Sequence, residues 1–127
     1  MKKTAPEDIA RYADMLAAMG TETRLRITQL LLTAHPDGMV VGEIQEELDL
    51  SPSTLSHHLE KLRHEGVVSM KREGVFLRYT ANTGAIENLL RFLYAECCSH
   101  SGALKPERII GIGERRQNDN GKPAKCC

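Results

Sequence analysis

The sequence predicts a mainly α-helical domain with one small β-hairpin. Apolar residues recur every three or four positions over much of residues 6–97, which is the period of an amphipathic helix. Two short β-rich runs flank Gly74, a pattern typical of a hairpin. With 127 residues, of which 41% are hydrophobic, the chain can bury the core of one domain. No apolar run approaches the roughly 20 residues that span a bilayer, so no membrane partner is expected.

The first two helices are predicted over residues 6–19 and between Thr21 and the turn at 35–38. Pro6 suits the first turn of a helix, and Gly20 suits its end. The apolar stripe of the first helix consists of Ile9, Tyr12, Leu16 and Met19, with Ala13 and Ala17 between them. Thr21 is expected to cap the second helix, whose apolar residues are Leu25, Ile27, Leu30, Leu31 and Ala34.

A pair of helices joined by a tight turn is predicted next. The first covers residues 42–48, and residues 39–41 before it form an edge strand or lead directly into it. The capping hydroxyl of Ser51 and a proline at Pro52 start the second helix, which continues to His64. The inward-facing residues are Ile44 and Leu48 on the first helix and Leu55, Leu59 and Leu62 on the second. These are the dimensions of a helix-turn-helix.

The hairpin follows this pair directly, as the wing of a winged helix-turn-helix would. Its strands are predicted at residues 67–71 and 75–80. Arg72, Glu73 and Gly74 separate the strands, and Gly74 supplies the positive φ that the turn requires.

A last helix begins near Thr83. Its apolar stripe consists of Ile86, Leu89, Leu90, Leu93 and Cys97, while Phe92 and Tyr94 lie off that stripe and indicate a second contact surface. Residues 1–100 thus form one domain. Residues 101–127 are rich in Gly, Ser, Asn, Lys and Arg and are expected to form a largely disordered tail.

The solvent side of the helix from Pro52 to His64 carries hydrogen-bonding groups and no acid in its first two turns. Short hydroxyls and imidazoles near a helix N-terminus can reach base edges in a major groove, and cations beside them can hold phosphates. The predicted DNA-binding residues are Ser51, Ser53, Thr54, Ser56, His57, Lys61 and Arg63 on the helix and Lys71, Arg72 and Arg78 on the wing. The alternative is an ordinary polar helix face beside a hairpin that only completes the core.

The two neighbouring histidines have different predicted roles. His58 lies three residues after Leu55 and four before Leu62, so it is expected to pack in a partly buried position. His57 points further outward and is the candidate for DNA contact.

Three stretches carry a more specific pattern: residues 20–27 (GTETRLRI), residues 50–62 (LSPSTLSHHLEKL), and the hairpin segments GVV at 66–68 and REG at 72–74. Together they resemble the ArsR/SmtB family of winged-helix repressors over about residues 6–100. The resemblance implies a homodimer joined through the first and last helices. It also implies a double-stranded operator with an inverted repeat and an inducer that releases the protein from it. Spare apolar side chains at Leu16, Met19, Phe92 and Tyr94 are consistent with a dimer.

The four cysteines form two adjacent pairs, Cys97-Cys98 and Cys126-Cys127. Neighbouring cysteines seldom bridge each other, and the N-terminus lacks the apolar stretch of a secretory signal, so a cytoplasmic protein is expected. Thiolates are soft ligands that favour As(III), Sb(III), Cd(II) or Hg(II). Adjacent helical residues point about 100° apart. Chelation by Cys97 and Cys98 is therefore expected to fray the helix end and to disturb the spacing of two recognition helices.

The resemblance implies that the Cys97-Cys98 pair senses a metalloid. The predicted function is therefore a repressor of a metalloid-resistance operon, with As(III) or a related trivalent metalloid as inducer. The family's C-x-C site is absent, because residues 40–42 are Val-Val-Gly. The family's zinc site uses Asp and His on the last helix, where only His100 is nearby, so zinc sensing is not expected. A family variant with Glu-Cys-Cys on the last helix adds a third cysteine, which residues 99–104 lack. Either Cys126 and Cys127 supply the missing ligand, or two thiolates suffice and the inducer is methylarsenite.

Three further alternatives stay open. The same Cys97-Cys98 pair can sense antimonite, thiol oxidation or persulfide. A cysteine-based reductase would need an activated thiolate, whereas these cysteines follow a long helix near its negative end, so no enzyme activity is expected. A winged helix that binds only protein would show no salt-dependent affinity for duplex DNA.

Overall fold

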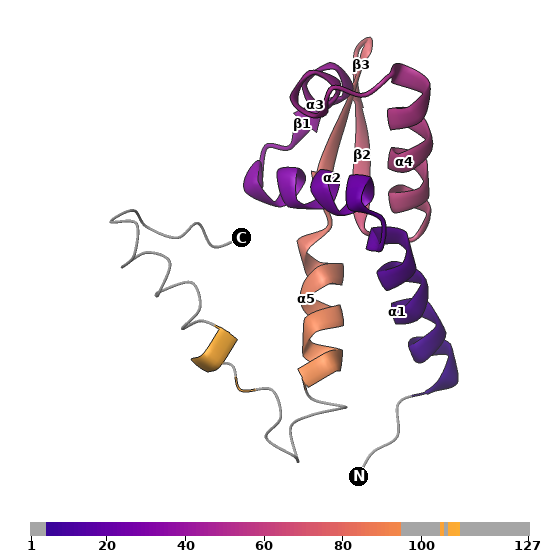
Figure 1. The fold of residues 1–127 in the computed structure, drawn as a ribbon, viewed down its shortest axis with the longest axis vertical. Helices are drawn as coiled ribbons and strands as arrows, with labels where there is room; N and C mark the ends of the chain where they lie inside the picture. The colour runs from indigo at the N-terminus through magenta and orange to yellow at the C-terminus, as the bar shows by residue number, and fades with distance from the viewer. Residues whose placement is uncertain (1–4, 95–104, 106, 110–127) are drawn as a thin grey trace.

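The computed structural model describes residues 5–94, 105 and 107–109, and residues 5–94 form a winged helix-turn-helix (Figure 1). The elements, in chain order, are α1 (Pro6–Met19), α2 (Glu22–Thr33), β1 (Met39–Val40), α3 (Val41–Leu48), α4 (Pro52–His64), β2 (Val68–Glu73), β3 (Phe76–Ala81) and α5 (Thr83–Phe92). The order predicted from the sequence is confirmed, including the short strand that leads straight into α3. Among the described residues, no helix is both long and apolar enough to cross a membrane.

The strands form one antiparallel sheet in the order β1-β3-β2. β3 is therefore the central strand, and β2 is an edge strand whose register with β3 runs from Val68 opposite Ala81 to Glu73 opposite Phe76. The domain core lies between this sheet and the helices, and its largest fully buried side chains are Met15, Ile27, Leu31, Ile44, Leu55, Leu59, Leu62, Val67 and Val68.

The domain has two functionally different ends. In Figure 1 the tip of the β2–β3 hairpin and the start of α4 lie at one end of the long axis, and α1 and α5 extend toward the other. The sequence explains this arrangement. Gly66 has a φ of 76° after α4, and Asn82 donates to the Gly66 carbonyl at 3.0 Å, so the chain reverses at the C-terminal end of α4 and β2 runs back along it.

The strands of the hairpin lie slightly further along the chain than predicted, at Val68–Glu73 instead of 67–71 and at Phe76–Ala81 instead of 75–80. Arg72 and Glu73 were expected in the loop, but both belong to β2, and the turn consists only of Gly74 and Val75. Gly74 has a φ of 61°, as predicted. A two-residue loop with glycine first has the pattern of a type II′ turn, whose twist matches that of the strands and so allows them to stay paired up to the turn.

The apolar stripe predicted for α1 divides into two faces. Met15 and Ala18 are the buried residues of this helix, and Tyr12 and Met19 are half-buried against the core. Ile9 and Leu16 are 50% and 44% exposed. The expectation that Leu16 is spare surface is confirmed in the single chain, whereas Met19 packs against the core.

Phe92 was expected on a second contact surface, but its ring stacks on Tyr12 of the same chain, with the ring centroids 4.6 Å apart. This contact joins α5 to α1.

Candidate nucleic-acid interface

The start of α4 is fixed by the Ser51 side chain. Its Oγ accepts a hydrogen bond from the Thr54 backbone N–H at 3.3 Å and donates to Thr54 Oγ1 at 2.8 Å. Pro52 occupies the first turn, where its missing N–H costs no helical hydrogen bond. Ser51 is therefore the N-cap, as predicted, and its hydroxyl is already engaged within the chain.

The outward face of the first two turns of α4 is polar and accessible. Ser53, Thr54, Ser56 and His57 are all exposed, while Leu55, Leu59 and Leu62 on the opposite face are fully buried or nearly so. Acidic residues on this helix begin only at Glu60. This half of α4 therefore offers hydroxyl and imidazole groups, which can donate to or accept from base edges, with no carboxylate among them.

His58 is half-buried, as predicted, and contacts an arginine that sequence reasoning missed. Arg24 Nη1 lies 3.5 Å from His58 Nδ1, and Arg24 Nε donates to the Ala18 carbonyl. Burial lowers the pKa of His58, and the nearby Arg24 and His57 lower it further. Arg24 thus connects the end of α1, helix α2 and helix α4, and it positions α4 relative to the other two. The sequence gives only a weak signal for this role, a base in an acidic N-terminal segment.

Three of the predicted phosphate-binding cations have carboxylate partners. Arg63 Nη2 lies 2.6 Å from Glu60 Oε1, an ion pair that raises the pKa of Arg63 and lowers that of Glu60. Lys61 Nζ lies 4.0 Å from Glu65 Oε1. Arg78 Nε lies 2.9 Å from Glu73 Oε1.

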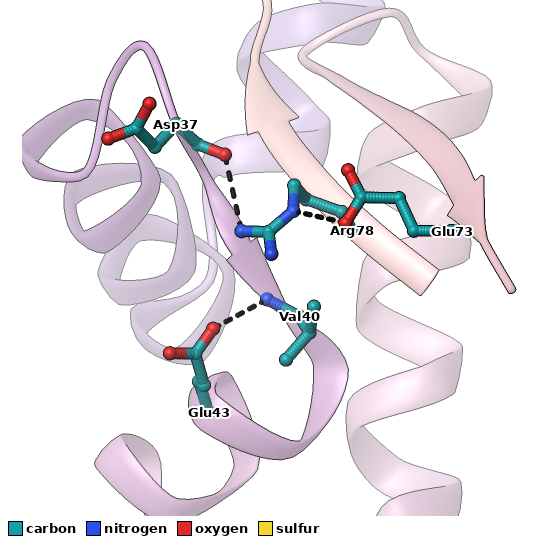
Figure 2. Close-up of polar contacts among 5 residues, drawn as sticks. All are labelled: Asp37, Val40, Glu43, Glu73 and Arg78. Carbon is teal, nitrogen blue, oxygen red and sulfur yellow. Dashed lines mark hydrogen bonds and ion pairs between the residues drawn. The ribbon is translucent and has the colours of Figure 1, made fainter. Parts of the chain in front are cut away.

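Arg78 also connects the wing to the loop before β1. Figure 2 shows its guanidinium between the Glu73 carboxylate and the Asp37 backbone carbonyl, with Nη1 3.4 Å from that oxygen. The same view shows Val40 donating its backbone N–H to Glu43 Oε1 at 3.0 Å, which closes the first turn of α3. Arg78 on β3 therefore connects β2, through Glu73, to the loop before β1, through Asp37.

Lys71 and Arg72 differ from the other predicted cations. Both are exposed on the edge strand β2, and within residues 5–94 neither forms an ion pair. Their side chains point to opposite faces of the hairpin, because neighbouring residues of a strand alternate between its two faces. Lys71 shares a face with its partner Arg78, and Arg72 shares the other face with its partner Leu77. They are the cations best placed to take a new anionic partner without breaking an existing pair.

The predicted metal ligands Cys97, Cys98, Cys126 and Cys127 lie outside the described residues, as does His100. Within the residues that the structure does describe, no group of three His, Cys, Asp or Glu side chains could hold a metal ion. The cysteine ligand set therefore stays a prediction from the sequence.

Residues 19–70 match the model of a family described as a helix-turn-helix domain. The transcriptional activator HlyU of Vibrio cholerae is 34% identical over 89 residues, which cover 70% of this chain and 80% of HlyU. A solved structure of HlyU superposes with a TM-score of 0.58 at 36% identity, covering 72% of this chain and 99% of that one.

The names of several relatives include a metal or metalloid: cadmium, mercury or arsenic. A probable mercury resistance operon repressor of Streptomyces lividans is 30% identical over 116 residues, 89% of this chain and 86% of that protein. The arsenic resistance transcriptional regulator ArsR1 of Pseudomonas putida is 28% identical over 102 residues, 79% of this chain and 78% of ArsR1. The similar proteins thus share a fold and a regulatory role, while the ions in their names differ.

Proposed function

The chain belongs to the ArsR/SmtB family of winged-helix transcriptional regulators, and on this premise we propose that it is a homodimeric repressor that a trivalent metalloid releases from operator DNA. The family consists of transcription regulators and not of enzymes, so the cysteine-reductase alternative is set aside.

The observation that carries the DNA-binding proposal is the acid-free, exposed first half of α4, which lies at the same end of the domain as the tip of the β2–β3 hairpin. Ser53, Thr54, Ser56 and His57 are proposed to contact base edges in a major groove. Helix α3 exposes Glu43, Glu46 and Glu47, which phosphates would repel. Direct contact is therefore proposed for α4 and the wing.

The phosphate contacts are proposed to differ in strength. Lys71 and Arg72 bind phosphate at no cost to an existing pair. Lys61, Arg63 and Arg78 would have to share their charge with Glu65, Glu60 and Glu73. Exposed ion pairs are weak, so these three can still approach DNA, but each brings a carboxylate with it. Lys71 and Arg72 should therefore contribute most of the electrostatic part of the affinity for DNA.

Dimerisation is proposed through α1 and α5. Ile9 and Leu16 are seven residues apart on α1. Leu90 on α5 and Tyr94, in the helical turn that continues α5, are four residues apart. Each pair therefore lies on one face of its helix. All four are exposed in the single chain, with Leu90 at 61%. Because Tyr12 and Phe92 stack, α1 and α5 can present these residues together. A second copy would bury them and place two α4 helices on half-sites about 34 Å apart.

The inducer site is proposed at Cys97 and Cys98, with Cys126 and Cys127 as the source of a third sulfur. The support is chemical: thiolates are soft ligands, and this pair follows α5, one of the two helices proposed to form the dimer interface. Metalloid chelation would disturb the end of that helix and with it the spacing of the α4 helices. A regulator of mercury resistance and one of arsenic resistance among the relatives are consistent with a thiophilic ion.

DNA binding is tested by titrating the full chain with a duplex selected from a random-sequence pool. The expected result is enrichment of an inverted repeat and a steep loss of affinity as salt rises. Ser53→Ala and His57→Ala should weaken binding to the selected duplex, while Gln29→Ala on α2, also an exposed polar residue, serves as the matched control. Failure to enrich any duplex would contradict the proposal.

The inducer is tested by adding arsenite, methylarsenite, antimonite or Hg(II) to the protein–duplex complex. Arsenite should release the wild type, whereas Cys97→Ser with Cys98→Ser should bind DNA normally and stay bound. A chain truncated after Lys125 separates the two ligand sets: if it responds to methylarsenite but not to arsenite, Cys126 and Cys127 supply the third sulfur. Release of the double variant by arsenite would place the sensing site elsewhere, and release by peroxide but not by any of these ions would favour a thiol-oxidation sensor.

A further inference from the structure

Arg24 is held by four polar contacts, two to its main chain and two to its guanidinium. Its backbone N–H donates to Thr21 Oγ1 at 3.2 Å, and its carbonyl accepts from Thr28 Oγ1 at 2.9 Å. Its Nε donates to the Ala18 carbonyl, and its Nη1 lies 3.5 Å from His58 Nδ1. The position of this half-buried side chain is therefore fixed from both ends.

The contact with Ala18 connects Arg24 to the end of α1, which lies where α2 begins, beside α4 (Figure 1). Carbonyls in the last turn of a helix have no partner within the helix, and the helix dipole makes that end negative. Helix α1 carries no basic residue in its own last turn. Arg24 supplies the missing cation from α2 and passes it on to His58. One side chain thus joins a helix proposed for dimerisation to the helix proposed to read DNA.

The contact between Arg24 and His58 requires a neutral imidazole. A guanidinium has five N–H donors and no acceptor, and a ring nitrogen accepts only when it carries no proton. With Nδ1 facing Arg24, the single proton of the neutral ring is on Nε2. A second proton would turn Nδ1 into a donor and place two cations side by side, so the contact would be lost.

The surroundings of His58 do not favour its cation. The charged groups that act on it are Arg24 on α2 and His57 on α4, whose ring centroid is 5.8 Å from that of His58. Helix α1 adds no charge here, because residues 16–19 are Leu-Ala-Ala-Met. Among the described residues, no carboxylate acts on His58. Burial, then Arg24 and His57, lower its pKa from 6.5, so the contact is intact above pH 6.5 and is lost as the pH falls through the lowered pKa.

We propose that Arg24 is a positioning residue that fixes the orientation of α4 through neutral His58, and that protonation of His58 loosens α4 and relaxes the choice of operator spacing. The inference rests on the proposed DNA-binding function and adds a proton-controlled element to it. Two α4 helices of a dimer must meet half-sites about 34 Å apart. One inserted base pair moves a half-site by about 3.4 Å and turns it by about a tenth of a helical turn. A firmly held α4 rejects that change, whereas a loosened α4 tolerates it.

The test uses the full chain and two duplexes, the one that the wild type selects and the same duplex with one base pair inserted between its half-sites. The measured quantity is the ratio of the two affinities, called here the spacing ratio. Extra positive charge at low pH strengthens binding to both duplexes alike, so it cancels in this ratio. The wild-type spacing ratio should be constant from pH 8 to 6.5 and should fall roughly tenfold by pH 5.

Two variants separate the parts of the contact. Arg24→Lys keeps the charge, but one ammonium group cannot span the Ala18 carbonyl and His58, so the spacing ratio should be low at every pH. This variant should still bind a single half-site, which imposes no spacing. His58→Asn offers an amide oxygen in place of Nδ1 and does not titrate, so its spacing ratio should be high at every pH. Arg26→Lys, at an exposed arginine paired with Glu22 on the same helix, is the matched control and should behave as the wild type.

A wild-type spacing ratio that stays constant from pH 8 to 5 would overturn the inference and leave the proposed function intact. An Arg24→Lys variant with the wild-type ratio and pH profile would do the same. If Arg24→Lys does not fold, His58→Asn decides: a ratio that still falls with pH shows that another group titrates, and the inference is wrong. Loss of the wild-type dimer mass at pH 5 would assign the effect to assembly and also overturn it. If no duplex is selected at all, the proposed function fails first, and the inference fails with it.

Discussion

Arg72→Ala should make duplex binding less dependent on salt, whereas the charge-neutral double variant Glu60→Gln/Arg63→Gln should leave the dependence nearly unchanged. Arg72 is exposed and has no acid partner within residues 5–94, so it can neutralise a phosphate directly. Arg63 is bound through two hydrogen bonds to Glu60, at 2.6 and 3.2 Å. Removing both members of that pair changes no net charge.

The expected magnitude follows from the number of unpaired cations. Each phosphate contact on B-DNA contributes about −0.9 to the slope of log K against log salt. With only Lys71 and Arg72 fully engaged, a dimer makes about four contacts and has a slope of about −3.6. If Lys61, Arg63 and Arg78 contributed equally, about ten contacts would give about −9. Arg72→Ala removes two contacts per dimer and should reduce the slope to about −1.8.

The assay is fluorescence anisotropy with a labelled duplex between 50 and 200 mM salt. Over that range the wild type should lose about 150-fold in affinity, and Arg72→Ala should lose about 12-fold. Lys71→Ala should behave like Arg72→Ala. The reasoning would be refuted by a wild-type slope near −9 that Arg72→Ala leaves unchanged, because the paired arginines would then carry the contact. A dimer mass for each variant, measured without DNA, shows that the comparison is made on intact assemblies.

The remaining predictions concern stability and assembly. Ser51→Ala removes the cap of α4 and should lower the free energy of unfolding by about 1 kcal/mol, measured by urea titration, whereas Ser53→Ala on the same turn should change it little. The pKa of His58 in the folded protein is lowered from its usual 6.5, so the unfolded chain binds a proton on His58 more tightly than the folded protein does. The stability that neutral His58 contributes is therefore present above pH 6.5 and is lost as the pH falls through the lowered pKa. His58→Gln should therefore flatten the acid side of the stability profile, and an unaltered profile would show that another group titrates there. Leu16→Lys with Leu90→Lys should yield monomers in sedimentation, since both side chains are exposed in one chain, while retention of a dimer would exclude the α1–α5 face.

The local features of the fold could be predicted from the sequence. Caps at Thr21 and Ser51, the positive φ of Gly74 and the alternation of apolar residues depend on the conformation of a few neighbouring residues. Such signals do not depend on the rest of the chain, which is why the element order and the helix-turn-helix were predicted correctly. The exposed face of α4 followed as well, because the leucines at 55, 59 and 62 fix which side of the helix is buried.

Contacts between distant residues could not be predicted in this way. Periodicity identified the apolar positions of α1 but could not separate Met15, which the core buries, from Ile9 and Leu16, which stay exposed. Nor could it show that Phe92 stacks on Tyr12 rather than standing free. An apolar side chain gains the same free energy from any dry surface, so composition alone does not say which surface it meets.

The electrostatics of the proposed DNA interface show most clearly what the sequence determined and what the tertiary structure decided. The sequence by itself determined which cations the wing and α4 carry. Only the fold decided which of them are unpaired, because it places Glu73 beside Arg78 and the Asp37 carbonyl within reach of the same guanidinium (Figure 2), while Lys71 and Arg72 have no acid nearby among residues 5–94. The energy of a charge depends on distances of a few ångströms, and those distances exist only once segments far apart in the chain have packed together.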